Sequence, residues 1–121
     1  MYDIYFYKDK NGHSPVLEYL QELTSKKDKD SRIKANKISS YIDMLRMYGT
    51  QIGEPYIKHL DDDIWELRPI RDRILFAAWD GSSFILLSCF MKQTQKTPQR
   101  EIEKAKSNLE NFRKRSDNHE S

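Results

Sequence analysis

Residues 64–98 read IWELRPIRDRILFAAWDGSSFILLSCFMKQTQKTP and hold most of the strand signal in the chain. The runs Arg73–Trp79 and Phe84–Met91 are rich in aliphatic, aromatic and β-branched residues, which favour strands. Asp80-Gly81 lies between them, and this dipeptide between two apolar runs predicts a hairpin. Both runs are apolar on both faces, so we expect two central strands that are covered on each side.

Shorter strands are expected on either side of this hairpin. Residues 65–69 alternate in polarity and end at Pro69, which cannot donate to a strand ladder. Residues 56–60 predict another short strand just before them. Near the N-terminus, residues 2–7 alternate aromatic and other residues, which indicates an edge or second strand.

Helical periodicity occupies the rest of the chain. Ser14-Pro15 supplies an N-cap and a first-turn proline for one helix, and Thr97-Pro98 does the same for the last. A longer helix is predicted over residues 31–48, with Gly49 as its C-cap. The apolar stripes expected to pack on the sheet are Val16, Leu20 and Leu23; Ala35, Ile38, Ile42 and Leu45; and Ile102, Ala105, Leu109 and Phe112.

The predicted order of elements is therefore β-α-α-β-β-β-β-α. This order indicates an α+β fold with a mainly antiparallel sheet, an antiparallel N-terminal helix pair on one face and a C-terminal helix. We expect one domain over residues 1–115 and a polar C-terminal tail over residues 116–121.

Composition excludes little by itself. The net charge of +2 is too small to indicate a nucleic-acid binder, so such a function depends on where the charges lie. The single cysteine, Cys89, cannot form an internal disulfide, and its place in a strand run predicts a buried, inert thiol. No apolar run is long enough to cross a bilayer and the N-terminus has no signal pattern, so we expect a cytoplasmic protein.

The concentrated polar chemistry of the chain is cationic. The glycines form no phosphate-binding loop and the histidines have no paired ligand spacing, so we predict neither a metal nor a cofactor. Arg68, Arg73, Lys92 and Lys96 fall at or just beyond predicted strand ends, where hairpins can bring them together. Lys58 and His59 lie on the preceding strand.

A cationic cluster of this kind suits the cleavage of RNA by its own 2′-hydroxyl. That reaction needs charge stabilisation at phosphorus, a base for the hydroxyl and an acid for the departing 5′-oxygen. Arginine offers paired donors to phosphate oxygens, whereas lysine can also act as an acid when neighbouring cations lower its pKa. The alternative is that these residues are ordinary surface cations.

Three phrases carry a resemblance to a known family: Trp65-Glu66-Leu67-Arg68, Arg73-Ile74-Leu75, and FMKQTQKTP at residues 90–98. In this order they resemble the HigB branch of the RelE/ParE toxin superfamily, also described as phage-derived Gp49-like proteins. The likeness in motif order spans roughly residues 56–112. It implies a RelE/ParE-like single domain acting as the toxin of a type II toxin–antitoxin system. It also implies a ribosome-dependent, metal-free mRNA endoribonuclease that inhibits translation.

The resemblance also implies site residues. The arginine that opens the long strand falls on Arg73, and the basic residue that ends the next strand falls on Lys92. Lys96 follows closely, and Arg68 matches the arginine of the phrase Trp-Glu-Leu-Arg. We expect Arg73 to stabilise the phosphorane, Lys92 to serve the leaving group or its phosphate, and Lys96 to position RNA.

The general base stays unassigned. RelE-type members carry lysines where this chain has Ile64 and Glu66, and a C-terminal tyrosine that is lacking here after Tyr56. Glu66 and His59 are the candidates, although Glu66 could equally be an ion-pair partner of Arg68.

Further contacts with RNA are expected from one group of residues: Lys96, Lys58, His59, Phe90, Gln93 and Thr94. Phe90 could stack on a base or pack in the core, whereas strand positions predict core packing for Trp65 and Trp79.

The resemblance names partners as well. It implies a cognate HigA-like helix-turn-helix antitoxin, a heterotetrameric complex with it, and contact with the ribosome and mRNA but not with a membrane. Two other functions stay open. The ParE branch shares the fold and poisons DNA gyrase without cleaving RNA, and a phage or plasmid RNA-binding regulatory domain would not be toxic.

Overall fold

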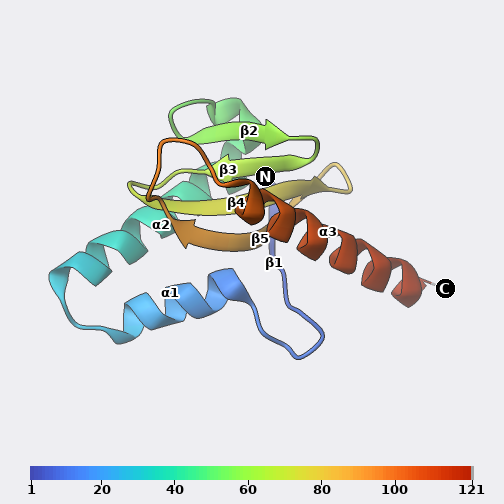
Figure 1. Ribbon diagram of the computed structural model, residues 1–121, viewed down its shortest axis with the longest axis horizontal. Helices are drawn as coiled ribbons and strands as arrows, with labels where there is room; N and C mark the ends of the chain where they lie inside the picture. The colour runs from blue at the N-terminus through green and yellow to red at the C-terminus, as the bar shows by residue number, and fades with distance from the viewer. Residues whose placement is uncertain (121) are drawn as a thin grey trace.

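Five strands form one sheet in the order β1-β5-β4-β3-β2 (Figure 1). They are β1 (Asp3–Phe6), β2 (Ile57–Asp61), β3 (Ile64–Leu67), β4 (Asp72–Trp79) and β5 (Ser83–Met91). β1 pairs with β5 in parallel, and all the other neighbours are antiparallel. The computed structural model describes the backbone of residues 1–120 and side chains through residue 116.

The helices are α1 (Pro15–Ser25), α2 (Lys29–Tyr48) and α3 (Gln99–Glu120), with a short 3-10 helix η1 (Gly49–Ile52) after α2. This is a mixed α+β domain whose α-helices and strands follow one another in the predicted order. α3 continues into the segment expected as a polar tail, and Ser121 lies outside the described residues.

The N-terminus of α2 differs from its prediction. The helix begins at Lys29 rather than near Ser31, because Asp28 is its N-cap and accepts a 2.9 Å hydrogen bond from the Ser31 backbone N–H. The C-terminus is as predicted: Gly49 ends the helix with φ of 65°. The positive φ favours glycine, and a Cβ at this position would also lie 2.9 Å from the Tyr2 ring and displace it.

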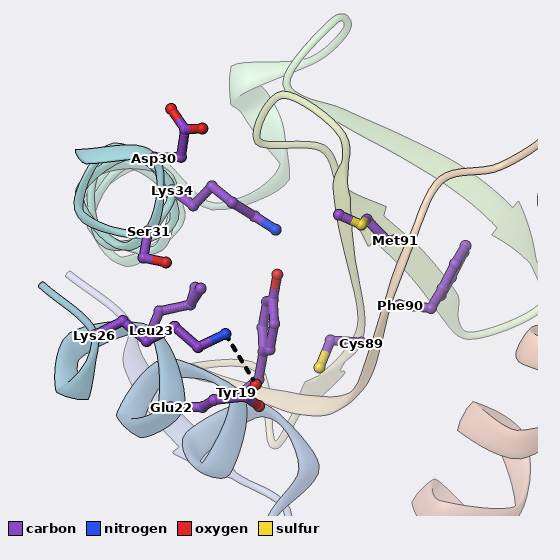
Figure 2. A pocket seen from close by; sticks show the side chains of 10 residues that line it. All are labelled: Tyr19, Glu22, Leu23, Lys26, Asp30, Ser31, Lys34, Cys89, Phe90 and Met91. Atoms are coloured by element: carbon purple, nitrogen blue, oxygen red, sulfur yellow. Dashed lines mark ion pairs between the residues drawn. The ribbon is translucent and has the colours of Figure 1, made fainter. Parts of the chain in front are cut away.

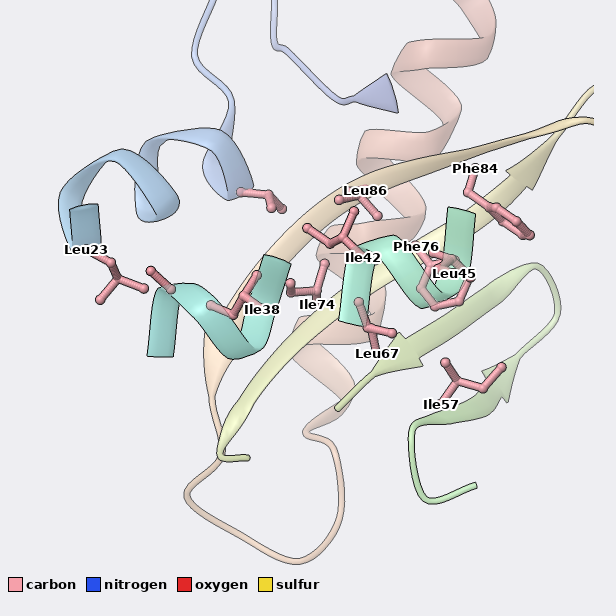
Figure 3. Packing of buried hydrophobic residues seen from close by; sticks show 12 residues of the cluster. Leu23, Ile38, Ile42, Leu45, Ile57, Leu67, Ile74, Phe76, Phe84 and Leu86 are labelled. Atoms are coloured by element: carbon pink, nitrogen blue, oxygen red, sulfur yellow. The ribbon is translucent and has the colours of Figure 1, made fainter. Parts of the chain in front are cut away.

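One face of the sheet packs on α1 and α2. The apolar stripes of both helices meet β2–β5 in a single cluster (Figure 3), which contains Val16, Leu23, Ala35, Ile38, Ile42, Leu45, Ile57, Leu67, Ile74, Phe76, Phe84 and Leu86. Trp65 packs against this cluster, as predicted. The helix pair therefore covers one face, as the periodicity indicated.

The opposite face packs on α3, which crosses the sheet in Figure 1. Ala105 and Leu109 of α3 are buried against residues of the central strands: Ile64, Leu75, Ala77, Ile85 and Leu87. Trp79 contacts Phe112 edge to face, with ring centroids 5.0 Å apart. The central strands are covered on both sides, so the prediction from their two apolar faces is confirmed.

Local geometry in the central hairpin prepares the docking of α3. Asp80 and Gly81 both have positive φ, 51° and 78°, as a tight hairpin turn requires. The pairing of β4 with β5 shifts register between Leu75 and Phe76. Near this bulge the Leu87 carbonyl accepts a 3.0 Å hydrogen bond from Asn108 of α3, so the irregularity is satisfied by the helix that covers it.

Candidate functional site

The candidate site lies at one end of the face that α3 covers. Glu66 pairs in register with Leu75 of the α3-side cluster, and Arg73 pairs with Phe90, which packs against that cluster. On this face the buried apolar residues therefore give way to Glu66 and Arg73, where β4 begins and β5 ends. The loop from β5 to α3 passes over this end of the sheet (Figure 1). A small hollow there is lined by Glu66, Arg68, Arg73, Phe90, Lys92, Gln93, Thr94, Gln95, Lys96, Thr97 and Pro98.

Arg73 is the most constrained cation of this group. Its side chain is 7% exposed, and Nη1 donates to the backbone carbonyls of Ile70 and Asp72 at 3.0 and 2.8 Å. Burial, followed by the nearby Arg68 charge, lowers the pKa of the guanidinium from its usual value, and the Glu66 carboxylate opposes this shift. The side chain is therefore a fixed cation in partly desolvated surroundings.

The backbone that holds Arg73 is a tight turn between β3 and β4. Ile70 has φ of 58°, a left-handed conformation that a β-branched residue rarely adopts. The Asp72 N–H donates to the Pro69 carbonyl at 3.0 Å and closes the turn. This conformation places the Ile70 carbonyl within reach of the guanidinium.

Glu66 is almost completely buried, with 1% of its surface exposed. Thr97 Oγ1 donates to Oε2 at 2.5 Å, while Oε1 lies 3.5 Å from Arg68 Nε and 3.9 Å from Arg73 Nε. The ion pair between Glu66 and Arg68, which the sequence left open, is present. This ion pair does not form a hydrogen bond, and Arg68 Nε has no acceptor among the described residues. A carboxylate held in this way suits the orientation of both arginines better than proton transfer to a substrate.

The lysines belong to a loop that is tied to the turn. The Lys92 N–H donates to the Arg71 carbonyl at 2.8 Å, and Arg71 Nη2 donates back to the Lys92 carbonyl at 3.2 Å. Thr94 Oγ1 bonds the Lys96 carbonyl at 2.7 Å, which closes the loop on itself. The side chains of Gln93, Thr94 and Lys96 are exposed, so they face an incoming ligand from a fixed backbone.

Lys58 and His59 are placed differently from each other. Lys58 pairs in register with Glu66 and therefore belongs to the same face of the sheet, one strand further out. His59 pairs with Trp65, and the two rings lie 4.7 Å apart on the opposite face. The structure does not bring His59 together with the arginines, so its imidazole stands apart from the candidate site.

The sequence interpretation missed a second group of polar side chains beside this site. Two of them, Tyr19 and Lys34, border a cavity of about 540 Å³ that lies between α1, α2 and the end of β5 (Figure 2). Tyr19 Oη donates to the carboxylate of Asp72 at 2.7 Å, and Lys34 Nζ lies 3.6 Å from the same oxygen. A tyrosine on an amphipathic helix and an aspartate at a strand end carry no periodic signal that would join them.

Cys89 also borders this cavity. Burial, followed by the charge of Asp72, raises the pKa of its thiol to about 12, which leaves almost no thiolate at neutral pH. The strand position predicted a buried, inert thiol; Cys89 is only partly buried, and its raised pKa makes it a poor nucleophile.

Two arginines and two lysines converge on the hollow, and such a group of cations has the chemistry to bind a phosphate. Arg73 is held by two backbone carbonyls and both arginines lie near the buried Glu66, whereas Lys92 and Lys96 line the hollow from the loop after β5. Among the side chains that the structure describes, no group of three His, Cys, Asp or Glu residues is arranged to hold a metal ion. No described helix is long and apolar enough to cross a membrane.

The family described as Phage derived protein Gp49-like (DUF891) matches residues 19–110, which is most of the chain. The chain belongs to this family. The match includes every residue of the hollow, as well as Tyr19, Lys34 and Asp72. Gp49-like proteins form a HigB-like, RelE-type toxin family, so the resemblance seen in the sequence is confirmed. No curated protein matches this Gp49-like chain.

Proposed function

We propose that this Gp49-like chain is a HigB-like toxin of a type II toxin–antitoxin system, with a RelE/ParE-type topology, that cleaves mRNA on the translating ribosome. The observation that supports this most is the guanidinium of Arg73, held by two carbonyls beside Arg68 at the edge of a lysine-lined hollow. A fixed cation that needs no rearrangement is what stabilises charge developing at phosphorus.

The proposed reaction uses the RNA itself as the nucleophile. The 2′-hydroxyl oxygen attacks the adjacent phosphorus as its proton leaves to a base, and the bond from phosphorus to the 5′-oxygen breaks. The departing 5′-oxygen takes up a proton, so the products are a 2′,3′-cyclic phosphate and a free 5′-hydroxyl. Negative charge collects on the equatorial oxygens of the phosphorane, where cationic donors contribute most.

Each cation has a place in this proposal. Arg73 binds the equatorial oxygens, and Glu66 holds Arg73 and Arg68 in orientation from its buried position. Lys92 serves the leaving 5′-oxygen or its phosphate, because it lies where β5 ends and borders the hollow.

The remaining contacts position the RNA strand. Exposed side chains of the loop, Gln93, Thr94 and Lys96, are proposed to contact the backbone, together with Lys58 one strand further out. Phe90 is half-buried, lines the hollow and packs against the α3-side cluster, and its ring is proposed to stack on a base.

A cognate antitoxin belongs to the same proposal. A ribosome-directed nuclease must be neutralised in its host, and the exposed cations of the hollow suit an acidic partner segment. We propose a HigA-like helix-turn-helix antitoxin, bound in a heterotetramer, that controls access of the ribosome and mRNA to this site in the cytoplasm.

The test is induced expression in growing bacteria, followed by mapping of mRNA 5′ ends and ribosome co-sedimentation. We expect growth arrest with new 5′ ends inside translated codons, and neither in the Arg73→Ala/Lys92→Ala double variant. The control is Arg46→Ala, since Arg46 pairs with Asp43 on α2 and borders no part of the hollow. Growth arrest without new 5′ ends but with gyrase inhibition would favour the ParE-like alternative, and full cleavage by the double variant would refute the proposed site.

A further inference from the structure

A buried carboxylate joins the helix pair to the turn that holds Arg73. Asp72 is 2% exposed, and its Oδ1 is 2.7 Å from Tyr19 Oη of α1 and 3.6 Å from Lys34 Nζ of α2. Figure 2 shows the Tyr19 hydroxyl and the Lys34 ammonium pointing toward each other across the cavity. The two helices and β4 therefore meet at one oxygen atom.

These contacts are mutually supporting. A carboxylate removed from water needs donors and a counter-charge, and Asp72 has one of each. The Lys34 ammonium also lies 5.5 Å from the centroid of the Tyr19 ring, within the range of a cation–π contact. Burial and the bond to Asp72 raise the pKa of Tyr19, so the phenol stays protonated and keeps donating. The arrangement fixes Asp72 relative to α1 and α2.

The backbone of the same residue contacts the candidate catalytic arginine. The Asp72 carbonyl accepts from Arg73 Nη1 at 2.8 Å, and the Asp72 N–H closes the turn onto the Pro69 carbonyl at 3.0 Å. The other carbonyl that binds Arg73, that of Ile70, belongs to this turn as well. A shift of Asp72 would therefore move both acceptors of the guanidinium.

We propose that Asp72, Tyr19 and Lys34 are positioning residues that set the orientation of Arg73 from the opposite side of the sheet. Their effect on RNA cleavage rests on the proposed function, whereas their effect on the Arg73 side chain does not. A purely structural role for the same three residues would change stability and leave the guanidinium where it is.

Tyr19→Phe is the most specific variant, because it removes one donor and keeps the ring, which packs on the apolar cluster between the sheet and α1 and α2. Tyr7→Phe is the matched control: Tyr7 is also packed in the core and its hydroxyl donates to Asn111 at 3.0 Å, on the α3 side and away from the turn. Both variants lose one hydrogen bond, and Tyr19→Phe should be destabilised more because its partner is a buried carboxylate, so cleavage is compared where both variants are fully folded. We expect Tyr19→Phe alone to lower kcat by about 10-fold to 100-fold at unchanged KM for ribosomes, as small displacements of catalytic groups do.

Two further comparisons separate positioning from stability. Asp72→Asn keeps an acceptor for Tyr19 and should retain more activity than Asp72→Ala. In an Arg73→Ala background, Tyr19→Phe should lower stability as before yet cause no further loss of cleavage, because the group that it positions is gone. An undiminished loss of cleavage in that background would overturn the proposal.

The deciding measurement needs no RNA. The Nε–Hε resonance of Arg73 in ¹⁵N-labelled protein should shift or broaden in Tyr19→Phe and Lys34→Met and stay unchanged in Tyr7→Phe. An Arg73 resonance unchanged in all three variants would overturn the proposal. A wild-type protein that cleaves no RNA would instead refute the proposed function, and the resonance would still test the positioning.

Discussion

The two faces of the sheet use their buried residues differently. On the side of α1 and α2, apolar packing continues from Ile57 on an outer strand to Phe84 on β5. On the side of α3, apolar packing stops at Ile64 and Leu75, and the next buried side chains along these strands are Glu66 and Arg73. The face on α1 and α2 is an apolar core with one buried carboxylate at its end, Asp72, whereas the face on α3 ends in a group of charges beneath a polar loop.

This difference shows how a small domain can hold a cationic site without losing its stability. The extensive apolar packing on α1 and α2 holds the sheet in place. The face on α3 can therefore bury two charged groups at its end, Glu66 and Arg73, each with partners. α3 begins only after the site, and the polar loop between β5 and α3 covers the remaining strand ends.

The largest expected effect tests whether the α3 face is a true core. Leu109 is 3% exposed among Ala105, Leu75 and Leu87, so Leu109→Asp would bury a carboxylate with no partner. The free energy of unfolding should fall by several kcal/mol, enough to threaten a domain of ordinary stability. Urea denaturation followed by circular dichroism measures this loss.

Ser107→Asp is the control for that experiment. Ser107 is exposed on the same helix, so a carboxylate there should change stability by less than about 0.5 kcal/mol. Equal stability of both variants would mean that α3 does not dock on the sheet through Leu109.

The next effect concerns the charged end of the same face. Arg73→Ala should lower ribosome-dependent cleavage by about 100-fold or more, as removal of one fixed electrostatic donor does. Arg73→Lys should restore only part of it, because lysine cannot reproduce the paired donors of the guanidinium. The measurement is single-turnover cleavage of a defined mRNA, and full cleavage by folded Arg73→Ala would contradict the assignment.

Much of the face that packs on α1 and α2 could be predicted from the sequence, because its apolar residues recur at helical spacing. Ile38, Ile42 and Leu45 recur at helical spacing and are all buried as predicted. The start of α2 could not be placed as well, since Asp28 lies within a run of charged residues that hides its capping role.

The charged end was predictable in part. Hairpin-linked strands bring their ends together, so Arg68, Arg73 and Lys92 could be grouped from their places in the sequence. Contacts such as Tyr19 with Asp72 and Thr97 with Glu66 join distant segments through single side chains, which leave no pattern in the sequence. His59 lies on the face opposite Lys58 because successive residues of β2 alternate between the two faces, which its place in the sequence beside Lys58 does not show.

Glu66→Gln asks whether the buried charge at this end is a base or an orienting group. Glutamine can still accept from Thr97, but Arg68 and Arg73 would lose the carboxylate near both of their Nε atoms. We expect the free energy of unfolding to fall by about 1–3 kcal/mol, as when a charged hydrogen-bonding group is lost. Cleavage should fall about tenfold, with an unchanged shape of the pH–rate profile.

A general base would give a different result. Its loss would lower the rate by about 100-fold to 10,000-fold and remove one limb of the pH–rate profile. That outcome would identify Glu66 as the general base.

The smallest effect distinguishes positioning cations from the fixed one. Lys96 is exposed on the loop over the site, so Lys96→Ala should weaken binding of RNA and leave the chemical step intact. Activity should recover at higher ribosome concentration, and the slope of log affinity against log salt should become shallower by about 0.7–0.9, since one fewer counterion is released. Lys10→Ala is the control: Lys10 is equally exposed, but it lies in the turn beside Asp9, whose carbonyl accepts from Arg115 far along α3. An unaltered salt slope in Lys96→Ala, or the same decrease in Lys10→Ala, would mean that the charged end of the α3 face does not extend to the loop that covers it.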